Sequence, residues 1–564
     1  MARSLTMQWV RTLARNQALA QHLGQDPLEV YKLSRDRHLS RRAMLAGFGT
    51  LGVAAGALGG APPARAAQQK RIAIVGAGMA GMSAALTLAD NGLTATIYEA
   101  SNRVGGRMHS ETSYWNYSSY APVSEYCGEL IDSDHTAMMT LASRFGLKLT
   151  DMVAAEPRGS TETYYLQSAP NSTIYDYYTV AQAVNDFVAV YNAVNSDANS
   201  TGGNTVWNSY NSYGLMFDKM SVYEWIGNRV PGGLSSPMGR LLNSAYEQEY
   251  GALTTDQSSL NIIYALSAQP TAGDFSIYGA SDQRFHIQGG NDQLPQAIAQ
   301  YLQSKGFPPI QSGYRMQVIS QTLTGVEMTF DVNGVPQKVV ADQVILTVPF
   351  SVLRTLDYSE AKFDARKVKA ITELGSGRNA KLFLQYTNRI WNRHGVWGKS
   401  NGDLYTDLGF KYFTGKEKYQ DLGPQNAWDT TRGQAGPYGL ITNYTGGDAA
   451  SNFVTPAPYL NASTPSVAGY AKVFTQTYDK PFPGSADLWN GRAILSTPFR
   501  DPNLLLSYSY WRVGQYTSFA GYEGVAQGLI HFAGEHCSLN FQGFMEGAAE
   551  EGQRAGLEVV NAAS

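Results

Sequence analysis

The 564-residue sequence contains only two cysteines, Cys127 and Cys537. Two cysteines are too few for a disulfide-rich scaffold and too few for a multi-cysteine zinc or iron–sulfur site. Positive charge is not in excess either, because 43 Lys and Arg residues stand against 46 Asp and Glu residues, a formal net charge of −3. A nucleic-acid partner bound through its phosphates is therefore not expected. The eight histidines show no metal-ligand spacing, so we also expect no metal site.

Charged residues are scarce, at 16% of the chain compared with about 25% in an average soluble domain. Hydrophobic residues make up 43% and aromatic residues 12%, so extensive disorder is not expected. At roughly 150 residues per domain, the length corresponds to about three or four domains. The composition indicates a globular, aromatic-rich protein that can bury a large core.

Residues 1–67 differ from the rest of the chain. The pair Arg41-Arg42 precedes a mildly apolar stretch, residues 43–61, and then the small-residue segment Ala64-Arg65-Ala66-Ala67. This order is typical of a secretion signal, and the paired arginines resemble a twin-arginine signal, which the export machinery reads. We expect a chain that is exported folded to the periplasm or the medium. A membrane anchor is the alternative, although its glycines make the stretch weakly apolar.

A dinucleotide-binding pattern follows the leader. Residues 71–75 form a short β-branched run typical of a buried parallel strand, and Gly76-Ala77-Gly78-Met79-Ala80-Gly81 comes directly after it. The three glycines permit a tight turn, close approach of the backbone to a pyrophosphate, and close packing of a helix on the strand. A second strand, residues 94–98, ends at Glu99, whose carboxylate can bind a ribose diol. The alternative is a glycine-rich turn without a ligand.

The segment Arg103-Val104-Gly105-Gly106-Arg107 follows Glu99, and its two arginines can neutralise a pyrophosphate. Together with Glu99, this segment resembles the FAD-binding start of the flavin-containing amine oxidases, a family that includes monoamine, polyamine and L-amino-acid oxidases. The resemblance implies that the dinucleotide is FAD.

Later segments are similar to the same family over about residues 70–560. Residues 288–295 look like its central glycine-pair element, and residues 341–349 look like the strand that returns the chain to the FAD domain. Residues 541–550, which follow Gly534-Glu535, look like its closing FAD signature. A helix that begins there would present N–H groups to the negatively charged edge of the reduced flavin.

The resemblance implies a set of FAD-binding residues. They are Gly76, Gly78, Ala80, Gly81, Glu99, Ala100, Arg103, Gly106, Arg107, Gly128, Glu129, Met316, Trp511, Gly534, Glu535, Gly543, Phe544 and Met545. Glu535 is expected at the ribityl chain, and Met545 is expected to present its backbone to the ring. Mammalian monoamine oxidases carry a flavin-linked cysteine where this chain has Gln515, so we expect the FAD to be non-covalent.

The expected catalytic residues are Lys381, Tyr516 and Phe544. Lys381 lies in an alternating run, residues 379–386, which predicts a half-buried strand on which a lysine usually points to solvent. The family, however, carries a lysine here that holds a water beside flavin N5, so the resemblance implies a role in oxygen chemistry. It also implies that Tyr516 and Phe544 form an aromatic slot for the amine. With 35 tyrosines in the chain, an ordinary core position is the alternative for Tyr516.

The loop Cys127-Gly128-Glu129-Leu130-Ile131-Asp132 corresponds to the family's loop beside the flavin ring. Many L-amino-acid oxidases have an arginine at the Leu130 position that binds the substrate carboxylate. Here the loop offers Glu129 and Asp132, which would suit a second cationic group on the substrate. The alternative is that one acid hydrogen-bonds a residue behind the site and the other lies on the surface. Bacterial members with such an acidic loop look closest to L-amino-acid oxidases.

The expected substrate-binding residues are Glu129, Asp132, Trp511 and Tyr516. For a substrate carboxylate, Arg284 and Arg512 are candidates by sequence neighbourhood alone.

We therefore expect an α/β (α+β overall) fold with a discontinuous Rossmann-type FAD-binding domain, residues 68–150, 280–349 and 505–564. Residues 151–279 and 350–504 are expected to form a substrate domain, with an antiparallel sheet and a helical lobe that includes a helix-like stretch over residues 223–250.

The expected activity is oxidative deamination of L-amino acids, basic ones among the candidates, to 2-oxo acids, ammonia and hydrogen peroxide, with molecular oxygen as acceptor. The alternatives are a monoamine or polyamine oxidase, a dehydrogenase that passes electrons to a quinone, and an FAD-holding protein without turnover. A homodimer is also considered.

Overall fold

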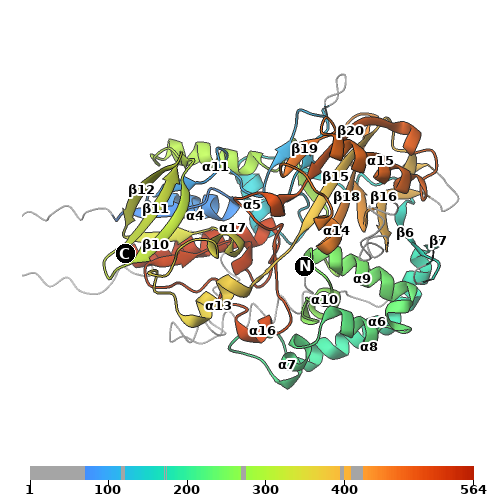
Figure 1. The fold of residues 1–564 in the computed structure, drawn as a ribbon, viewed down its shortest axis with the longest axis horizontal. Coiled ribbons are helices and arrows are strands. Elements are labelled where there is room, and N and C mark those ends of the chain that lie inside the picture. Colours follow the sequence, from blue (N-terminus) through green and yellow to red (C-terminus); the bar gives the residue numbers. More distant parts are fainter. Residues whose placement is uncertain are drawn as a thin grey trace, which may run out of the picture.

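The computed structural model describes residues 70–115, 121–169, 172, 174–268, 273, 275–393, 399–407 and 423–563. The leader predicted for residues 1–67 lies outside this range. Figure 1 shows two parts side by side, one around helices α4 and α17 and the other around a large sheet with a group of helices beneath it. Among the described residues, no helix combines the length and the apolar character that a membrane crossing requires.

A five-stranded parallel sheet forms the centre of the first part. Its strands lie in the order β22 (Ile530–Phe532), β13 (Gln343–Leu346), β1 (Ile72–Val75), β2 (Thr96–Glu99) and β9 (Gln311–Ser312). Because β1 and β13 are buried along their whole length, they are apolar without alternation. The strands come from three distant stretches of the chain, which confirms the predicted discontinuous Rossmann-type fold.

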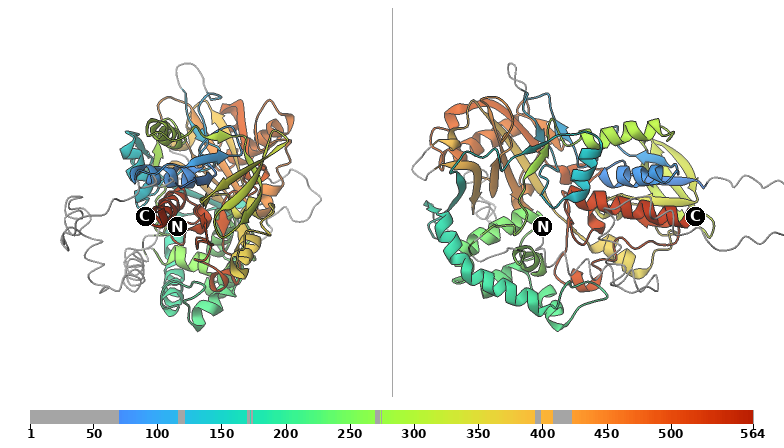
Figure 2. Two further views of the ribbon diagram at one scale, coloured as in Figure 1. Left: turned by 90° about the vertical axis from the view of Figure 1, so that its left-hand side faces the viewer. Right: turned by 180° about the vertical axis from the view of Figure 1, so that it is seen from behind.

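Helices α4 (Met79–Asp90) and α17 (Met545–Ala563) lie against each other beside this sheet, as both views in Figure 2 show. Their close approach depends on small residues. A Cβ atom added at Gly552 would lie 2.2 Å from the carbonyl oxygen of Ala80, so any larger residue there would push the helices apart. Helix α11 (Gln293–Ser304) also contacts α4, and α5 (Thr136–Arg144) contacts α17.

Smaller elements complete the first part and its borders. A three-stranded antiparallel sheet comprises β10 (Arg315–Gln321), β11 (Val326–Val332) and β12 (Val335–Ala341). Three two-stranded pairs are β3 (Ser110–Glu111) with β4 (Ser124–Glu125), β5 (Leu149–Asp151) with β8 (Phe285–Ile287), and β14 (Gly375–Ser376) with β21 (Ser509–Tyr510). The short helices are α12 (Phe350–Leu353), α13 (Ala365–Glu373), α16 (Gln515–Ser518) and the 3-10 turn η7 (Glu535–Cys537).

An eight-stranded sheet forms the second part. Its order is β19 (Tyr459–Asn461), β20 (Trp489–Ser496), β15 (Asn379–Tyr386), β18 (Gly439–Gly446), β17 (Asn426–Asp429), β16 (Ser400–Thr406), β6 (Thr161–Gln167) and β7 (Tyr175–Tyr178). All neighbouring pairs are antiparallel, as expected, except β16 and β6. These two strands run parallel because a long crossover that includes the helical lobe connects them.

The helical lobe consists of α6 (Val180–Ser200), α7 (Ser212–Asp218), α8 (Val222–Arg229), α9 (Pro237–Tyr250) and α10 (Leu260–Leu266). The helix-like stretch expected over residues 223–250 is two helices, because Pro231 and the glycines after it end α8 and Ser236 then caps α9. Helix α15 (Pro465–Asp479) packs on β20 and β15, and α14 (Gly447–Ser451) follows β18; η2 (Gly233–Ser235), η3 (Ile390–Asn392), η5 (Ala486–Leu488) and η6 (Pro498–Arg500) are 3-10 turns.

Candidate active site

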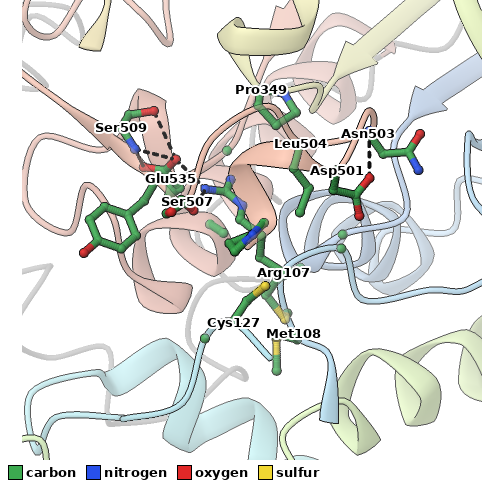
Figure 3. Close-up of a pocket in the computed structure, with 18 of the residues that line it drawn as sticks. Arg107, Met108, Cys127, Pro349, Asp501, Asn503, Leu504, Ser507, Ser509 and Glu535 are labelled. Atoms are coloured by element: carbon green, nitrogen blue, oxygen red, sulfur yellow. Dashed lines mark hydrogen bonds and ion pairs between the residues drawn. The ribbon is translucent and has the colours of Figure 1, made fainter. Parts of the chain in front are cut away.

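A cavity of about 490 Å³ lies between the parallel sheet and the eight-stranded sheet. Its walls come from the carboxyl ends of β1 and β2, from the start of α17, and from β15, β17 and β18. This volume is in the usual range of small-molecule and cofactor sites. Figure 3 shows the part of its wall around Arg107 and Glu535.

Most of the predicted FAD-binding residues line this cavity. They are Gly76, Gly78, Ala80, Glu99, Ala100, Arg103, Gly106, Arg107, Gly128, Glu129, Met316, Gly534, Glu535, Gly543, Phe544 and Met545. The structure thus brings segments from both ends of the chain into one wall. Their individual contacts with FAD stay a prediction.

Gly81 is on the predicted FAD-binding list but does not line the cavity. A Cβ atom at Gly81 would lie 1.9 Å from the carbonyl oxygen of Gly76. This glycine therefore lets α4 pack closely on β1, which is the role expected of the third glycine of the triplet. Gly76 itself has a φ of +106°, a conformation that favours glycine.

The start of α4 offers free backbone donors to an anion. Gly78 precedes the helix, and neither a capping side chain nor an acidic residue occupies its first turn, so its N–H groups can bind phosphate. Nearby, Glu99 accepts a hydrogen bond of 2.8 Å from the Ala77 N–H and another of 2.8 Å from the Ser101 N–H. These bonds hold its carboxylate at the cavity wall, where a ribose is expected.

The side-chain amide of Gln542, just before α17, also offers polar atoms to a ligand. The oxygen and nitrogen of Gln542 are buried and have no hydrogen-bond partner within the described part of the chain, although the residue lines the cavity. Buried polar atoms are normally paired. Together with the glycine triplet, this unpaired amide fits a polar cofactor such as FAD.

The partly buried Arg107 and the buried Glu535 form an ion pair at the cavity wall. The guanidinium lies 2.8 Å from a carboxylate oxygen of Glu535 and donates to the Ser507 carbonyl at 3.1 Å (Figure 3). Burial favours a raised pKa for Glu535, but Arg107 and the Gly543 N–H outweigh it, so the pKa lies below its ordinary value. The ionised Glu535 therefore binds Arg107, which follows β2 in the chain, and the N–H of Gly543, which comes just before α17. In this way it links these two segments of the cavity wall.

Lys381 is buried, which corrects the expectation of a half-buried strand. All eight residues of β15 are buried, because α15 covers one face and residues such as Trp115 pack against the other. The ammonium donates to the carbonyl oxygens of Glu125 and Cys127, at 3.1 and 2.7 Å, and to Glu129 at 2.7 Å. An ammonium has three N–H groups, so a water beside the flavin would require Lys381 to give up one of these bonds.

The aromatic wall contains Phe544, as predicted, but Tyr508 instead of Tyr516. Tyr516 is buried away from the cavity, where its hydroxyl donates to Asn261 at 2.8 Å. The chain leaves β21 after Tyr510 and turns at Gly514, with a φ of +81°, into α16. This turn carries Tyr516 into the core.

Tyr508 instead lies beside Gly543, the residue before Phe544. A Cβ atom at Gly543 would be 3.5 Å from the Tyr508 ring. Trp511 is also a core residue, since its indole donates to Glu523 at 2.9 Å and it does not line the cavity. The cavity wall therefore gives no support to the contacts with FAD and substrate that were predicted for Trp511.

The two acids of the substrate loop do not face the cavity as free carboxylates. Glu129 lines the cavity, but one oxygen binds Lys381 and the other accepts from the Trp428 indole at 2.9 Å. Asp132 does not line the cavity; it is buried and accepts from the Gln283 N–H at 2.9 Å. Neither acid is available to a second cationic group of a substrate.

The two arginines considered for a substrate carboxylate are also elsewhere. Arg284 pairs with Asp151 at 2.7 Å, and Arg512 is exposed; neither lines the cavity. The cationic residues among the described lining residues are Arg103, Arg107, Arg315 and Lys381. Lys381 and Arg107 are paired with carboxylates, and Arg103 donates to the Gly106 carbonyl.

Several residues of the cavity were not anticipated. They are Gln248, Glu249, Tyr278, Asn426, Trp428, Tyr444 and Tyr508. They come from the end of α9, from the segment before β8, from strands β17 and β18, and from the segment before β21. Their sequence surroundings carry no motif; only the alternation of Tyr508, Ser509 and Tyr510 could have indicated a strand with Tyr508 on one face.

Asp132, Asp134 and His135 bring ligand-type atoms within 4.8 Å of one another. Burial lowers the pKa of His135 to about 3, so the ring is neutral. Its Nδ1 accepts from the Asp132 N–H at 3.0 Å, which leaves the proton on Nε2. Since that protonated nitrogen is the one that faces Asp132, the group lacks a free imidazole ligand for a metal.

Known proteins are similar to this chain in sequence and in fold. An L-amino-acid oxidase of Mus musculus is 25% identical over 515 residues, 88% of this chain and 72% of the mouse protein. An L-amino-acid oxidase of Siganus canaliculatus is 27% identical over 363 residues, 60% of this chain and 61% of the fish protein. The match thus spans less than two thirds of the fish protein.

Solved structures of similar fold include the cyclohexylamine oxidase from Brevibacterium oxydans IH-35A, with a TM-score of 0.69 and 19% identity. A putrescine oxidase bound to putrescine has a TM-score of 0.69 and 17% identity. Each comparison covers 88% of this chain and 99% of the other chain, and at these identities it shows the common fold.

The family described as "Flavin containing amine oxidoreductase" matches residues 79–559. This match includes Glu99, Lys381 and the closing segment before α17, which the structure gathers around one cavity. The expected non-covalent FAD agrees with this family. The chain therefore belongs to the flavin-containing amine oxidoreductases and has FAD as its cofactor.

Proposed function

We propose that the chain catalyses the oxidative deamination of L-amino acids, with oxygen as acceptor, to 2-oxo acids, ammonia and hydrogen peroxide. The observation that carries this proposal is one cavity with two different ends. Gly76 and Gly78 of the dinucleotide-binding pattern line one end, and the rings of Tyr508 and Phe544 line the other. The curated relatives named above support the substrate class. Bound FAD supplies the two-electron oxidation of the carbon–nitrogen bond and is reoxidised by oxygen.

The protein side chains orient the amine and hold charge. The rings of Tyr508 and Phe544 can flank an amine nitrogen and favour its approach from one direction. The buried pair of Lys381 and Glu129 keeps the loop of residues 127–130 in place beside this slot. Trp428 donates to Glu129 and so fixes the far side of the same loop.

A monoamine or polyamine oxidase is the second candidate. It is favoured by the absence of an unpaired cation at the aromatic end among the described lining residues, because an α-carboxylate normally binds to arginine or lysine. The structures of similar fold also include amine oxidases.

Anaerobic bleaching of the purified flavoprotein distinguishes the candidates. Reduction by L-arginine or L-lysine, but not by putrescine or tyramine, with formation of a 2-oxo acid, supports the first candidate; the opposite pattern supports the second. Bleaching without peroxide formation in air would indicate a dehydrogenase that uses another acceptor. No bleaching by any amine or L-amino acid would indicate a binding protein.

We also propose that residues 1–67 direct export of the folded, FAD-loaded chain to the periplasm or the medium, and the support is the Arg41-Arg42 pair with its following apolar stretch. The experiment is fractionation of cells that express the full chain. The double variant Arg41→Lys/Arg42→Lys should retain the flavoprotein in the cytoplasm; unchanged export would contradict the proposal.

A further inference from the structure

Glu249 lies at the aromatic end of the cavity. It is the next-to-last residue of α9 and lines the cavity together with Gln248 and Tyr250. Its carbonyl oxygen accepts a hydrogen bond from the hydroxyl of Tyr508, the residue of the aromatic slot. A group bound at Glu249 would therefore be a neighbour of the reacting amine.

No cationic side chain among the described residues is paired with the carboxylate of Glu249. In the part of the chain that the structure describes, no ion pair or hydrogen bond to its carboxylate oxygens is found, whereas Glu129 and Glu535 in the same cavity are both paired with cations. Burial raises the pKa of Glu249 to about 7, and the nearby charge of Asp132 acts in the same direction. A positive group in the cavity would relieve this cost.

The position of Glu249 also conflicts with its own helix. The carboxyl end of a helix carries partial negative charge, so an acid in the last turn of α9 is unfavourable. No described basic residue occupies this turn to offset it. An acid that is unfavourable both at the carboxyl end of a helix and in a buried place, and that has no partner among the described residues, is typical of a functional position.

The surroundings of Glu249 suit an organic cation. The rings of Tyr278, Tyr444 and Tyr508 line the cavity near the end of α9. Tyr508 donates to the Glu249 carbonyl, its hydroxyl lies 3.0 Å from that of Tyr444, and Tyr278 donates to the Gln248 side chain at 2.6 Å. Burial raises the pKa of each tyrosine, and the charge of Glu249 adds to this effect. Aromatic rings attract ammonium and guanidinium groups. The combination of one carboxylate with several rings is selective for such groups over small metal ions, which prefer several oxygen ligands.

We propose that Glu249 forms a subsite for a second positive group of the substrate, an ammonium or guanidinium, while the reacting amine lies between Tyr508 and Phe544. This inference rests on the proposed function and specifies its substrate: a basic L-amino acid or, for the second candidate, a diamine. The role that sequence analysis gave to Glu129 and Asp132 thus passes to Glu249.

Two matched pairs of compounds test the subsite on the full-length holoenzyme. L-lysine and L-norleucine share a carbon skeleton and differ by the distal amine, and putrescine and butylamine differ in the same way. In the pair that reduces the flavin, the wild-type enzyme should have a higher kcat/KM for the compound with two amines. In Glu249→Gln, the ratio of the two values should fall about 30-fold, mainly through KM, because a buried charge pair is lost.

Two further variants control this result. Glu249→Asp keeps the charge and should retain part of the preference, whereas Glu360→Gln changes an exposed glutamate and should leave the ratio unchanged. The flavin spectrum reports folding in each case. Equal kcat/KM values within both pairs in the wild type, or an unchanged ratio in Glu249→Gln, would overturn the inference even if the variant Glu249→Asp failed to fold. The proposed function fails separately, if no L-amino acid bleaches the flavin.

Discussion

The ammonium of Lys381 lies 2.7 Å from a carboxylate oxygen of Glu129, and both side chains are more than nine-tenths buried, with exposed fractions of 7% and 3%. Breaking such a pair by removing one partner leaves an uncompensated buried charge, which is far more costly than removing both. The two residues join the eight-stranded sheet to the loop beside the expected flavin ring.

Lys381→Met should therefore lower the free energy of unfolding by about 3 kcal/mol and slow reoxidation of the reduced flavin while FAD stays bound. The double variant Lys381→Met/Glu129→Gln should recover much of the lost stability without recovering the reoxidation rate. Chemical denaturation and stopped-flow mixing with oxygen measure the two effects separately. Additive stability losses in the double-mutant cycle would contradict the pairing, and an unchanged reoxidation rate would remove Lys381 from oxygen chemistry.

The same pair predicts a pH dependence of stability. Burial acts to raise the pKa of Glu129, but Lys381 and the Trp428 indole outweigh it, so the pKa in the folded protein lies below the ordinary value of 4.5. A lowered pKa means that the stabilisation is complete above pH 4.5 and is lost as the pH falls through the folded-state pKa. Melting temperatures of wild type and Glu129→Gln should therefore differ at pH 7 and converge in acid. A constant difference down to acid pH would show that the Glu129 charge is not responsible.

Tyr508 and Tyr516 should respond differently to substitution. Tyr508→Leu removes a ring from the cavity wall and should lower kcat/KM about tenfold, because cation–π contacts contribute about 1–2 kcal/mol. Tyr516→Phe removes the hydrogen bond to Asn261 and should cost about 1 kcal/mol of stability with unchanged kinetics. Steady-state kinetics and thermal denaturation of both variants check this assignment. The reverse pattern would restore Tyr516 to the aromatic slot.

Sequence analysis found the parts of the site whose chemistry is local. Binding a dinucleotide phosphate requires glycines where the backbone turns tightly and free N–H groups or charges at fixed places within a few residues. This is why the spacing of the glycine triplet, of Glu99 and of the segment before α17 could be recognised in the sequence. Lys381 was matched by family resemblance, but its burial was not predicted, because alternation along β15 cannot reveal that both faces are covered.

The residues that were missed depend on tertiary structure. Tyr508 and Tyr516 lie in one aromatic-rich stretch, and only the turn at Gly514 decides which of them faces the cavity. Glu249 reaches the cavity because α9 ends against the eight-stranded sheet, where the Asn379 side chain bonds to the Gln248 carbonyl. No local pattern around either residue records these long-range contacts.

FAD should be released intact when the protein is denatured. The reason first given for a non-covalent cofactor, Gln515 at the linkage position, does not hold, because the Gln515 side chain is held by the Glu373 carbonyl away from the cavity. The cysteine that does line the cavity is Cys127, and burial raises the pKa of its thiol, so at neutral pH it is a protonated, unreactive group. Acid precipitation should therefore leave a colourless pellet and a yellow supernatant, for wild type and for Cys127→Ser alike. A yellow pellet from the wild type that becomes colourless in Cys127→Ser would instead identify Cys127 as a covalent attachment site.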